Sequence, residues 1–318
     1  MLITVAICTW NRADLLDQTL SEMRKLEIPQ GVEWELLVVN NNCSDHTDEV
    51  LARHQAFLPL RRLHEPQAGH SHARNCALAV ARGELLIWTD DDVLVDPHWI
   101  AAYCQAFERW PDAAFWGGAI EPWYETPPPP WVQNNLRLLE GMLVVRDLGS
   151  RETRFGPGQR PYGANMAMRL RQVQQYRFDV NLGRKGNELI SADETAFFTM
   201  LTQQGCQGVW VPSAKLRHFV PADRLTLNYF WKFFHGYGRT LVRLEGAPQG
   251  QPFLGAPRWL YRAYFERLLQ AFWKRWTRQP QWLTTYQQAA IMRGQIDEGR
   301  RQLRQSDAAL LASRELTS

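Results

Sequence analysis

The sequence has no long apolar run, few cysteines and little net charge. Of its 318 residues, 45% are hydrophobic, yet no stretch approaches the roughly 18 uninterrupted apolar residues of a membrane-spanning helix. The segment Leu2–Cys8 follows no basic residues and leads into polar ones, so we interpret it as a first strand and not as a signal peptide. We therefore expect a cytoplasmic protein whose membrane contact, if any, is peripheral.

Other features that the sequence lacks argue against further classes of protein and of binding site. A net charge of +3 is too small to indicate a nucleic-acid partner by itself. The five cysteines are odd in number and show no C-x-x-C, which is typical of structural thiols in a reducing compartment. Neither G-x-G-x-x-G nor G-x-x-x-x-G-K-[ST] occurs, which counts against a dinucleotide site and a P-loop. A nucleotide diphosphate would then be held by a metal and by cations such as Arg12 and Arg74.

What the sequence does contain is a short, dense apolar segment that ends in three acids. Leu85–Thr89 follows Gly83 and precedes Asp90, Asp91 and Asp92. Such a run is typical of a central strand buried on both faces, and ligands of an open α/β sheet bind at the carboxyl ends of its strands. Adjacent carboxylates repel one another, so a cluster of this kind usually holds a divalent cation. For the triplet alone, a solvated acidic turn is the alternative.

Strands alternate with helices along the first two thirds of the chain. Strands are predicted at 2–8, 34–39, 60–64, 85–89 and 113–118, with short ones at 209–212 and 215–219. This alternation predicts a doubly wound, mostly parallel α/β sheet. The segment 121–131 contains four consecutive prolines, from which we expect an extended surface loop.

From about residue 223 the pattern indicates helices only, so we predict two domains, residues 1–222 and a helical extension of residues 223–318. Residues 258–278 carry one acid, Glu266, and six basic residues: Arg258, Arg262, Arg267, Lys274, Arg275 and Arg278. Apolar residues recur there every four positions, which suits an anionic membrane surface, with packing on the first domain as the alternative. We expect the last helix, at about 283–303, to be mostly polar and to project into solvent.

Further polar segments accompany the acidic triplet. These are Thr9–Arg12, Asn40–Asp45, Gly69–Asn75, the pair Asp193 and Glu194, and His218 at the end of the last strand. In this order and spacing they resemble the loops of a family-2 glycosyltransferase with a GT-A fold, over roughly residues 1–222. The resemblance implies that the first two segments hold a nucleotide, that the third flanks its diphosphate, and that the triplet supplies the D-x-D motif.

The resemblance also assigns roles to single residues. Those implied to bind the nucleotide sugar are Thr9, Asn11, Arg12, Asn40, Asp45, Arg74, Asp90 and Asp91. Asp92, together with Asp90 and His218, would bind Mn²⁺ or Mg²⁺, and the histidine would favour Mn²⁺. Asn40 stands where the family usually has an Asp that accepts the N3–H of uracil or thymine, and an amide oxygen can still accept that bond.

The predicted general base is one of the two acids that open the late helix. Adjacent residues of a helix point about 100° apart, so Asp193 and Glu194 cannot both face the acceptor. The family pattern favours Glu194, whereas Ser191–Glu194 also fits a capping box in which Glu194 would bind the backbone. The resemblance implies a metal-dependent, inverting transfer from a UDP- or dTDP-sugar to a glycan or lipid-linked acceptor in cell-envelope polysaccharide synthesis.

Two other functions stay open at the level of sequence. A nucleotidyltransferase would also use metal-binding acids, but it usually has a glycine-rich loop near the first strand, and residues 9–14 contain no glycine. A non-catalytic sugar-binding protein would use the basic aromatic segment and leave the acids idle.

Overall fold

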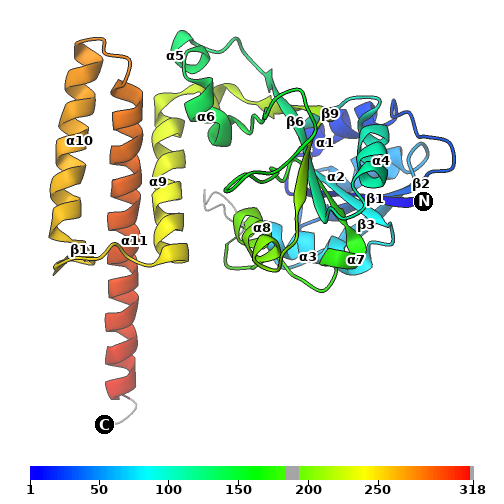
Figure 1. Ribbon diagram of the computed structural model, residues 1–318. Coiled ribbons are helices and arrows are strands. Elements are labelled where there is room, and N and C mark those ends of the chain that lie inside the picture. Colours follow the sequence, from blue (N-terminus) through cyan, green and yellow to red (C-terminus); the bar gives the residue numbers. More distant parts are fainter. Residues whose placement is uncertain (183–192, 316–318) are drawn as a thin grey trace. The chain divides into compact units, whose positions relative to one another are not determined.

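The computed structural model describes residues 1–182 and 193–315, with side chains as far as residue 305. Within these limits the chain forms two compact units (Figure 1). The first contains residues 1–182 and 193–222, and the second contains residues 223–315. Each unit has its own buried apolar cluster.

The first unit is built on one nine-stranded sheet with the path β3-β2-β1-β4-β8-β6-β9-β5, and β7 pairs with β9. The strands are β1 (Leu2–Thr9), β2 (Glu33–Asn40), β3 (Leu60–His64), β4 (Leu85–Thr89), β5 (Val93–Val95), β6 (Phe115–Tyr124), β7 (Thr153–Arg154), β8 (Asn165–Arg169) and β9 (Gly208–Val220). The first four are parallel neighbours, as are β6 and β9, whereas β5, β7 and β8 run antiparallel to their partners. The predicted α/β sheet is confirmed.

Apolar residues of the central strand alternate between the two faces of this sheet. In β4, Leu85 and Ile87 belong to one buried cluster, while Leu86 and Trp88 belong to the other. The first cluster includes residues of α1 (Ala13–Met23) and α4 (Trp99–Arg109), and the second includes residues of α3 (His70–Val80) and α8 (Asp193–Gln203). Each large apolar side chain contributes about 1.5–3 kcal/mol when fully buried. The loop after β4 therefore starts from a firmly held strand.

Two of the predicted strand boundaries are wrong. β6 continues through Tyr124 by pairing with β9, and Pro130–Gln133 form the short helix α5, so the expected loop at 121–131 is shorter at both ends. The strands expected at 209–212 and 215–219 are one strand, β9. Pro212 lacks an N–H, and the ladder between β6 and β9 shifts register near it, between Gly118 and Ile120. A missing donor is tolerated at such an irregularity.

Further helices of the first unit are α2 (Thr47–His54), α6 (Leu136–Leu143) and α7 (Leu170–Val173). The 3₁₀ turn η1 (Ala222–Leu225) starts at the last residue of the first unit, and the second unit consists mainly of α9 (Leu227–Glu245), α10 (Arg258–Trp276) and α11 (Trp282–Glu315). A two-residue hairpin, β10 (Pro252–Phe253) and β11 (Ala256–Pro257), precedes α10. α11 contacts both α9 and α10 and lies between them (Figure 1).

The expectation that the last helix projects into solvent is wrong for its first half. Leu283, Ala289 and Ile296 are at most 1% exposed. The two helices approach closely where side chains are missing: a Cβ on Gly294 would lie 2.0 Å from the carbonyl oxygen of His235 of α9. Likewise, a Cβ on Gly238 would lie 2.1 Å from the carbonyl oxygen of Ile291. A helix that packs through small residues has little apolar content, which explains why its sequence pattern is mostly polar.

A buried carboxylate also joins α11 to α9. Glu298 is 0% exposed and bonds to Arg239 over 3.0 Å, to Arg243 over 2.8 Å and to Arg301 over 2.5 Å. Burial raises the pKa of Glu298, but the hydrogen bonds from the three arginines outweigh this effect and lower the pKa to about 2. The carboxylate is therefore ionised at neutral pH and its charge is fully compensated.

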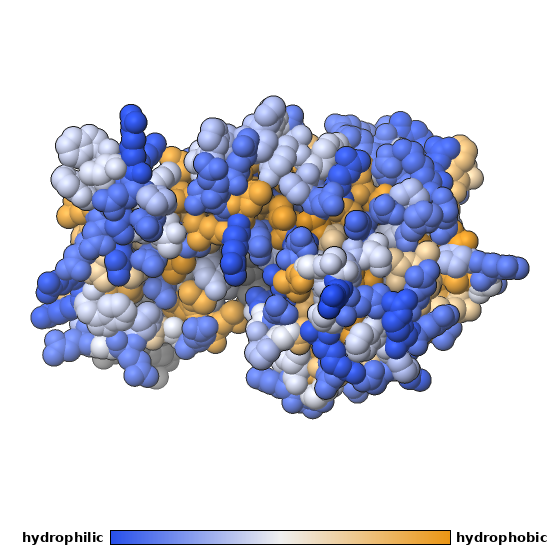
Figure 2. Space-filling model, turned by 45° about the horizontal axis from the view of Figure 1, so that its top comes forward, coloured by the Kyte–Doolittle hydropathy of each residue, from blue (hydrophilic) through white to orange (hydrophobic). Residues whose placement is uncertain are grey.

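α10 has two different faces. Leu260 and Tyr264 are buried in the cluster with α11, whereas Phe265, Phe272 and Trp276 are between 58% and 77% exposed. The sequence pattern placed Leu260, Tyr264, Phe272 and Trp276 on one stripe, but a repeat of four drifts by about 40° per step, so the later members turn away from the core. Figure 2 shows orange apolar patches among blue hydrophilic side chains over the helical unit, at the left of the view.

Within the described residues, no helix is both long enough and apolar enough to cross a membrane. All five cysteines lie in the described part of the chain and are free thiols.

Candidate active site

The acidic triplet lies at the carboxyl end of β4, beside the carboxyl ends of β1 and β2. Thr9 and Asn40, the last residues of β1 and β2, are direct register partners. Asp91 and Asp92 are 4% and 2% exposed, whereas the side chain of Asp90 is 29% exposed. Three neighbouring parallel strands thus bring the polar segments predicted for a nucleotide to one edge of the sheet.

Burial and mutual repulsion change the acidity of the triplet. Burial raises the pKa of Asp90, the Asp92 charge raises it further and Arg74 opposes both, which leaves this pKa at about 7. Burial also raises the pKa of Asp91 to about 6, although the Arg12 charge opposes it. Carboxyl groups that keep protons near neutral pH are poorly compensated, and a bound cation would relieve this state.

Arg12 supplies a cation to two of these acids from the loop after β1. Its Nη1 atom lies 2.6 Å from Asp92 Oδ2 and 3.2 Å from Asp91 Oδ1. The Thr9 hydroxyl donates to Asp91 Oδ2 over 2.7 Å. The side chain of Arg12 is nevertheless 39% exposed. A guanidinium that holds two acids and still reaches solvent is well placed to meet an incoming phosphate.

Two further residues predicted for the nucleotide hold the loops after β1 and β2 together. Asn11, in the left-handed backbone region with φ 51°, accepts the Ser44 N–H through Oδ1 over 2.7 Å. Asp45 Oδ2 accepts the Ala13 N–H over 2.9 Å at the start of α1. The sequence segments 9–12 and 40–45 therefore form one surface. Some of their hydrogen-bonding groups bond to each other and hold this surface together.

Asn40 is bonded on both sides of its amide. Its Oδ1 atom accepts the Cys43 N–H over 2.8 Å, and its Nδ2 atom donates to Asp48 Oδ1 over 2.7 Å. An amide oxygen has two lone pairs, so Oδ1 can accept one more hydrogen bond. The amide thus keeps acceptor capacity, although Asn40 is only 3% exposed.

Asp90, Asp92 and His218 form a possible metal site. Each offers one ligand atom, and these atoms lie within 4.8 Å of one another. His218 Nε2 is 3.2 Å from Asp92 Oδ1 and 3.8 Å from Asp90 Oδ2. The strand pairing explains this approach, because His218 on β9 is the register partner of Val93 on β5. Two carboxylates and one imidazole suit Mn²⁺ and also accept Mg²⁺, so the residues fit the predicted metal.

Arg74 bonds to both candidate bases at the start of α8. It is 1% exposed, and its Nη1 lies 2.9 Å from Asp193 Oδ2 while its Nη2 lies 2.6 Å from Glu194 Oε1. The side chain of Asp193 is 5% exposed and that of Glu194 is 28% exposed. Glu194 is thus the more accessible acid, whereas Asp193 is enclosed with its cation.

Glu194 is held from a second side by the loop before β8. Its Oε2 atom accepts the Gly163 N–H over 3.1 Å. A Cβ on residue 163 would lie 2.0 Å from Glu194 Oε1 and 2.2 Å from Arg74 Nη2, so a side chain there would have to displace this ion pair. The capping-box role proposed for Glu194 involves Ser191, which lies outside the described residues.

Sequence patterns did not indicate the roles of two neighbouring residues. The Thr19 hydroxyl donates to the backbone oxygen of Asp91 and accepts the Val93 N–H, each over 3.0 Å, and so fixes the acidic turn. A buried threonine on the apolar face of α1 is the signal that could have identified it. His70 Nδ1 lies 3.7 Å from Asp193 Oδ2. His70, Asp193 and Glu194 form a second group of metal-ligating side chains. Arg74 already bonds the carboxylates of both Asp193 and Glu194.

Comparison with known proteins identifies the class of enzyme. The family described as Glycosyl transferase family 2 matches residues 4–172, which is more than half of the chain. The chain belongs to this family and is a glycosyltransferase.

Two relatives illustrate the similarity in sequence. The succinoglycan biosynthesis protein ExoM of Rhizobium meliloti (strain 1021) is 26% identical over 246 residues, which cover 76% of this chain and 74% of ExoM. The uncharacterized glycosyltransferase YfnE of Bacillus subtilis (strain 168) is 32% identical over 111 residues, which cover 34% of this chain and 28% of YfnE.

Two solved structures show the similarity in fold. The mannosyltransferase PcManGT from Pyrobaculum calidifontis, in complex with GDP-Man and Mn²⁺, aligns with a TM-score of 0.57 and 16% identity, over 99% of this chain and 79% of its own. S. aureus TarS 1–349, in complex with UDP-GlcNAc, aligns with a TM-score of 0.53 and 13% identity, over 96% of this chain and 92% of its own. At these identities the likeness concerns the fold alone, and the predicted GT-A type is confirmed.

Proposed function

We propose that this glycosyltransferase moves a sugar, with inversion, from a UDP- or dTDP-sugar to a hydroxyl of a glycan or lipid-linked acceptor, and that it requires Mn²⁺ or Mg²⁺. The observation that carries the proposal is the electrostatic link between the two acidic clusters. Beyond the effect of burial, the pKa of Asp90 is lowered by Arg74 and raised by Glu194. Asp90 and Glu194 thus lie near enough to influence each other's charge, which supports the proposal that the metal ligands and the base act on one bound substrate.

Asp90, Asp92 and His218 would hold the cation, which acts as a Lewis acid for the leaving diphosphate. Arg12, whose side chain reaches solvent, would donate guanidinium N–H bonds to phosphate oxygens, and the buried Arg74 would add positive charge nearby. Asn11, Asn40 and Asp45 shape the nucleotide surface, and Thr9 orients Asp91.

Glu194 is proposed as the general base because it is the accessible member of its pair. The Arg74 guanidinium and the Gly163 N–H hold its carboxylate in one orientation, so that an oxygen can take the proton of the acceptor hydroxyl. Asp193 is proposed as the positioning residue that keeps Arg74 in place. Direct attack by the activated hydroxyl displaces the diphosphate in one step, which inverts the configuration of the sugar.

Slow donor hydrolysis tests this proposal. The purified chain is incubated with Mn²⁺ and a panel of UDP-, dTDP- and GDP-sugars, and release of the nucleoside diphosphate is measured. We expect release from a uridine or thymidine donor. A matched incubation with nucleoside triphosphates and sugar 1-phosphates should release no pyrophosphate, whereas pyrophosphate there with no diphosphate from any donor would indicate a nucleotidyltransferase.

We also propose that the enzyme works in the cytoplasm at an anionic membrane surface, through the exposed face of α10. That face combines Phe265, Leu269, Phe272 and Trp276 with basic neighbours such as Arg262. Each basic residue near anionic lipid contributes about 1 kcal/mol, and aromatic side chains favour the headgroup level. ExoM is a succinoglycan biosynthesis protein, which supports a polysaccharide or its lipid-linked precursor as acceptor.

Flotation with phosphatidylglycerol liposomes tests the membrane contact. The unchanged chain should float at low salt and lose this binding at high salt, because screening weakens the attraction between basic residues and anionic lipid. Replacing Leu269 and Phe272 by Ser should reduce binding, since both are more than 70% exposed and leave the core intact when shortened. Replacing Phe57, which is 63% exposed in the first unit, by Ser is the matched control. Equal flotation of both variants would contradict the proposal.

A further inference from the structure

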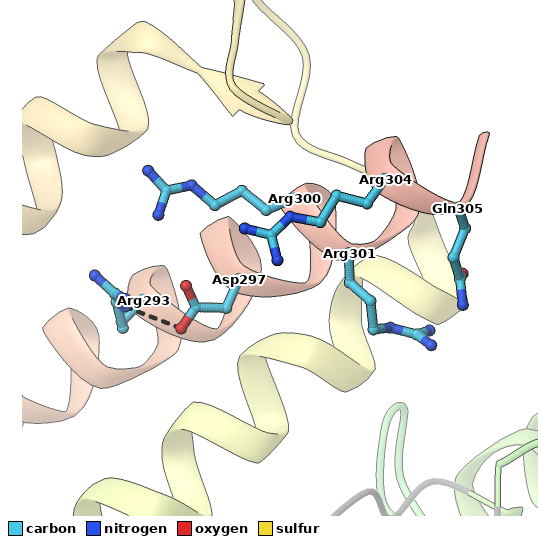
Figure 3. Close-up of a pocket in the computed structure, with 6 residues that line it drawn as sticks. All are labelled: Arg293, Asp297, Arg300, Arg301, Arg304 and Gln305. Carbon is cyan, nitrogen blue, oxygen red and sulfur yellow. Dashed lines mark hydrogen bonds and ion pairs between the residues drawn. The ribbon is translucent and has the colours of Figure 1, made fainter. Parts of the chain in front are cut away.

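A groove in the helical unit gathers arginines that the proposed transfer reaction does not use. It has a volume of about 460 Å³ and is lined by residues of α11, namely Arg293, Asp297, Arg300, Arg301, Arg304 and Gln305 (Figure 3). A second hollow of about 420 Å³ shares Arg293 and Asp297 with it and adds Trp231, Lys232 and His235 of α9 and Tyr264 of α10. The two hollows therefore adjoin along one helix.

Helical spacing explains why these cations meet. Positions 293, 297, 300 and 304 recur at intervals of three or four residues, which places them on one face of α11. Side chains of a helix lean toward its amino terminus. Accordingly, Figure 3 shows the side chains of Arg300 and Arg304 running along α11 toward Arg293, whereas Arg301 turns to the other side.

The acids near the groove compensate only part of this charge. Arg301 bonds to Glu298, whose carboxylate also holds two arginines of α9. Arg293 pairs with Asp297 over 2.9 Å, and His235 Nε2 lies 3.0 Å from the same oxygen. Among the side chains described up to residue 305, the carboxylates of Asp297 and Glu298 are thus each shared between several cations.

Arg300 and Arg304 are differently placed. Among the residues whose side chains are described, no carboxylate lies within ion-pair distance of either one. Arg300 is held in place, because its Nε donates to the Tyr261 hydroxyl over 3.0 Å and its guanidinium lies over the Tyr261 ring at 5.3 Å. Its remaining N–H groups are oriented before any ligand arrives. Like charges held this close repel one another, and an anion bound between them would remove that repulsion.

We propose that this groove binds the diphosphate of a lipid-linked acceptor, an inference that rests on the proposed function. Guanidinium groups match phosphate oxygens two bonds at a time, and a diphosphate is long enough to engage more than one arginine. The adjoining hollow supplies Trp231 and Tyr264, aromatic rings that suit a sugar or prenyl group next to the diphosphate. The helical unit thereby selects acceptors by their anionic anchor.

Titration of the full chain with geranyl diphosphate measures this binding, with geraniol and inorganic phosphate as reference ligands. Replacing Arg300 and Arg304 together by Gln should weaken the binding of geranyl diphosphate at least about tenfold, because charge-assisted bonds are lost. The matched control replaces Arg53 and Arg109 of the first unit by Gln, which removes the same charge at exposed positions outside the groove and should leave the dissociation constant unchanged. Equal affinity of the unchanged chain and the Arg300→Gln/Arg304→Gln variant overturns the proposal.

Amide hydrogen exchange shows where the ligand binds. Binding in the groove should slow exchange in residues 293–305, because a ligand stabilises the state that holds it. Slowing confined to residues 9–12 and 69–75 would place the ligand at the donor site and overturn the proposal. Donor hydrolysis by the unchanged chain is a separate measurement, so its failure would contradict the proposed function while the tenfold loss of affinity would still support the groove.

Binding to phosphatidylglycerol vesicles distinguishes a lipid-linked diphosphate from a phospholipid headgroup as the ligand of the groove. If the Arg300→Gln/Arg304→Gln variant binds vesicles as well as the unchanged chain does and yet loses geranyl diphosphate, the diphosphate assignment is supported. If it loses vesicle binding and keeps its affinity for geranyl diphosphate, the groove recognises a phospholipid headgroup and the proposal is wrong.

Discussion

Replacing Asp92 by Asn should abolish sugar transfer, and EDTA should do the same to the unchanged chain. Asp92 is 2% exposed and lies 3.2 Å from His218 Nε2 and 2.6 Å from Arg12 Nη1. The substitution removes one charged oxygen ligand from the proposed metal site. Stabilisation of a leaving group by a cation contributes several kcal/mol, so we expect turnover to fall by at least about 10³-fold.

The measurement is steady-state transfer or donor hydrolysis, with and without added Mn²⁺. Excess Mn²⁺ should restore activity after chelation in the unchanged chain and should not restore it in Asp92→Asn. Asp14→Asn is the matched control, because the side chain of Asp14 is 89% exposed at the start of α1. Full activity in EDTA would show that no metal is needed, and the assignment of Asp90, Asp92 and His218 would be wrong.

Replacing Glu194 by Gln should lower turnover about 10²- to 10⁴-fold, the usual contribution of a general base, while nucleotide binding is retained. The change keeps the length of the side chain and an oxygen that can accept from Arg74 or Gly163. In the proposed mechanism, the proton of the acceptor hydroxyl would then have no carboxylate to receive it.

Asp193→Asn is the informative comparison for this prediction. Asp193 is buried with Arg74, so its substitution should chiefly lower the melting temperature, because breaking a buried ion pair costs up to about 3–5 kcal/mol. Glu27→Gln, at a side chain that is 68% exposed, is the matched control. If Glu194→Gln lowers only the melting temperature while Asp193→Asn stops transfer, the two roles are exchanged.

The main features of the catalytic fold could be predicted because they depend on local patterns. The dense apolar run before Asp90 has a different helix layer on each side, so all of its residues are buried and the acids emerge at the sheet edge. The polar segments after β1 and β2 follow from the same rule, since parallel neighbours end at the same edge.

The pairing of charges could not be predicted in this way. Arg12 meets Asp91 across 79 positions of the chain, and Arg74 meets Asp193 across 119 positions. Nothing in the local sequence states which cation faces which acid, because that is decided by how the strands are ordered in the sheet. The amide of Asn40 is a different case, because its partners Cys43 and Asp48 lie only three and eight positions further along the chain, where the loop after β2 folds back on the end of that strand.

The interface between α9 and α11 differs from the sheet, because its close contact depends on a residue that has no side chain. Gly294 on α11 follows Arg293 directly, and it touches the carbonyl group of His235 on α9. Arg293 and His235 both line the second hollow, so the separation of its α9 and α11 sides is fixed by a contact at which no methyl group fits. Because Gly294 has only hydrogen atoms on its α-carbon, α9 and α11 stay close together at this point. This short distance between the helices limits the width of a ligand that the second hollow can accept.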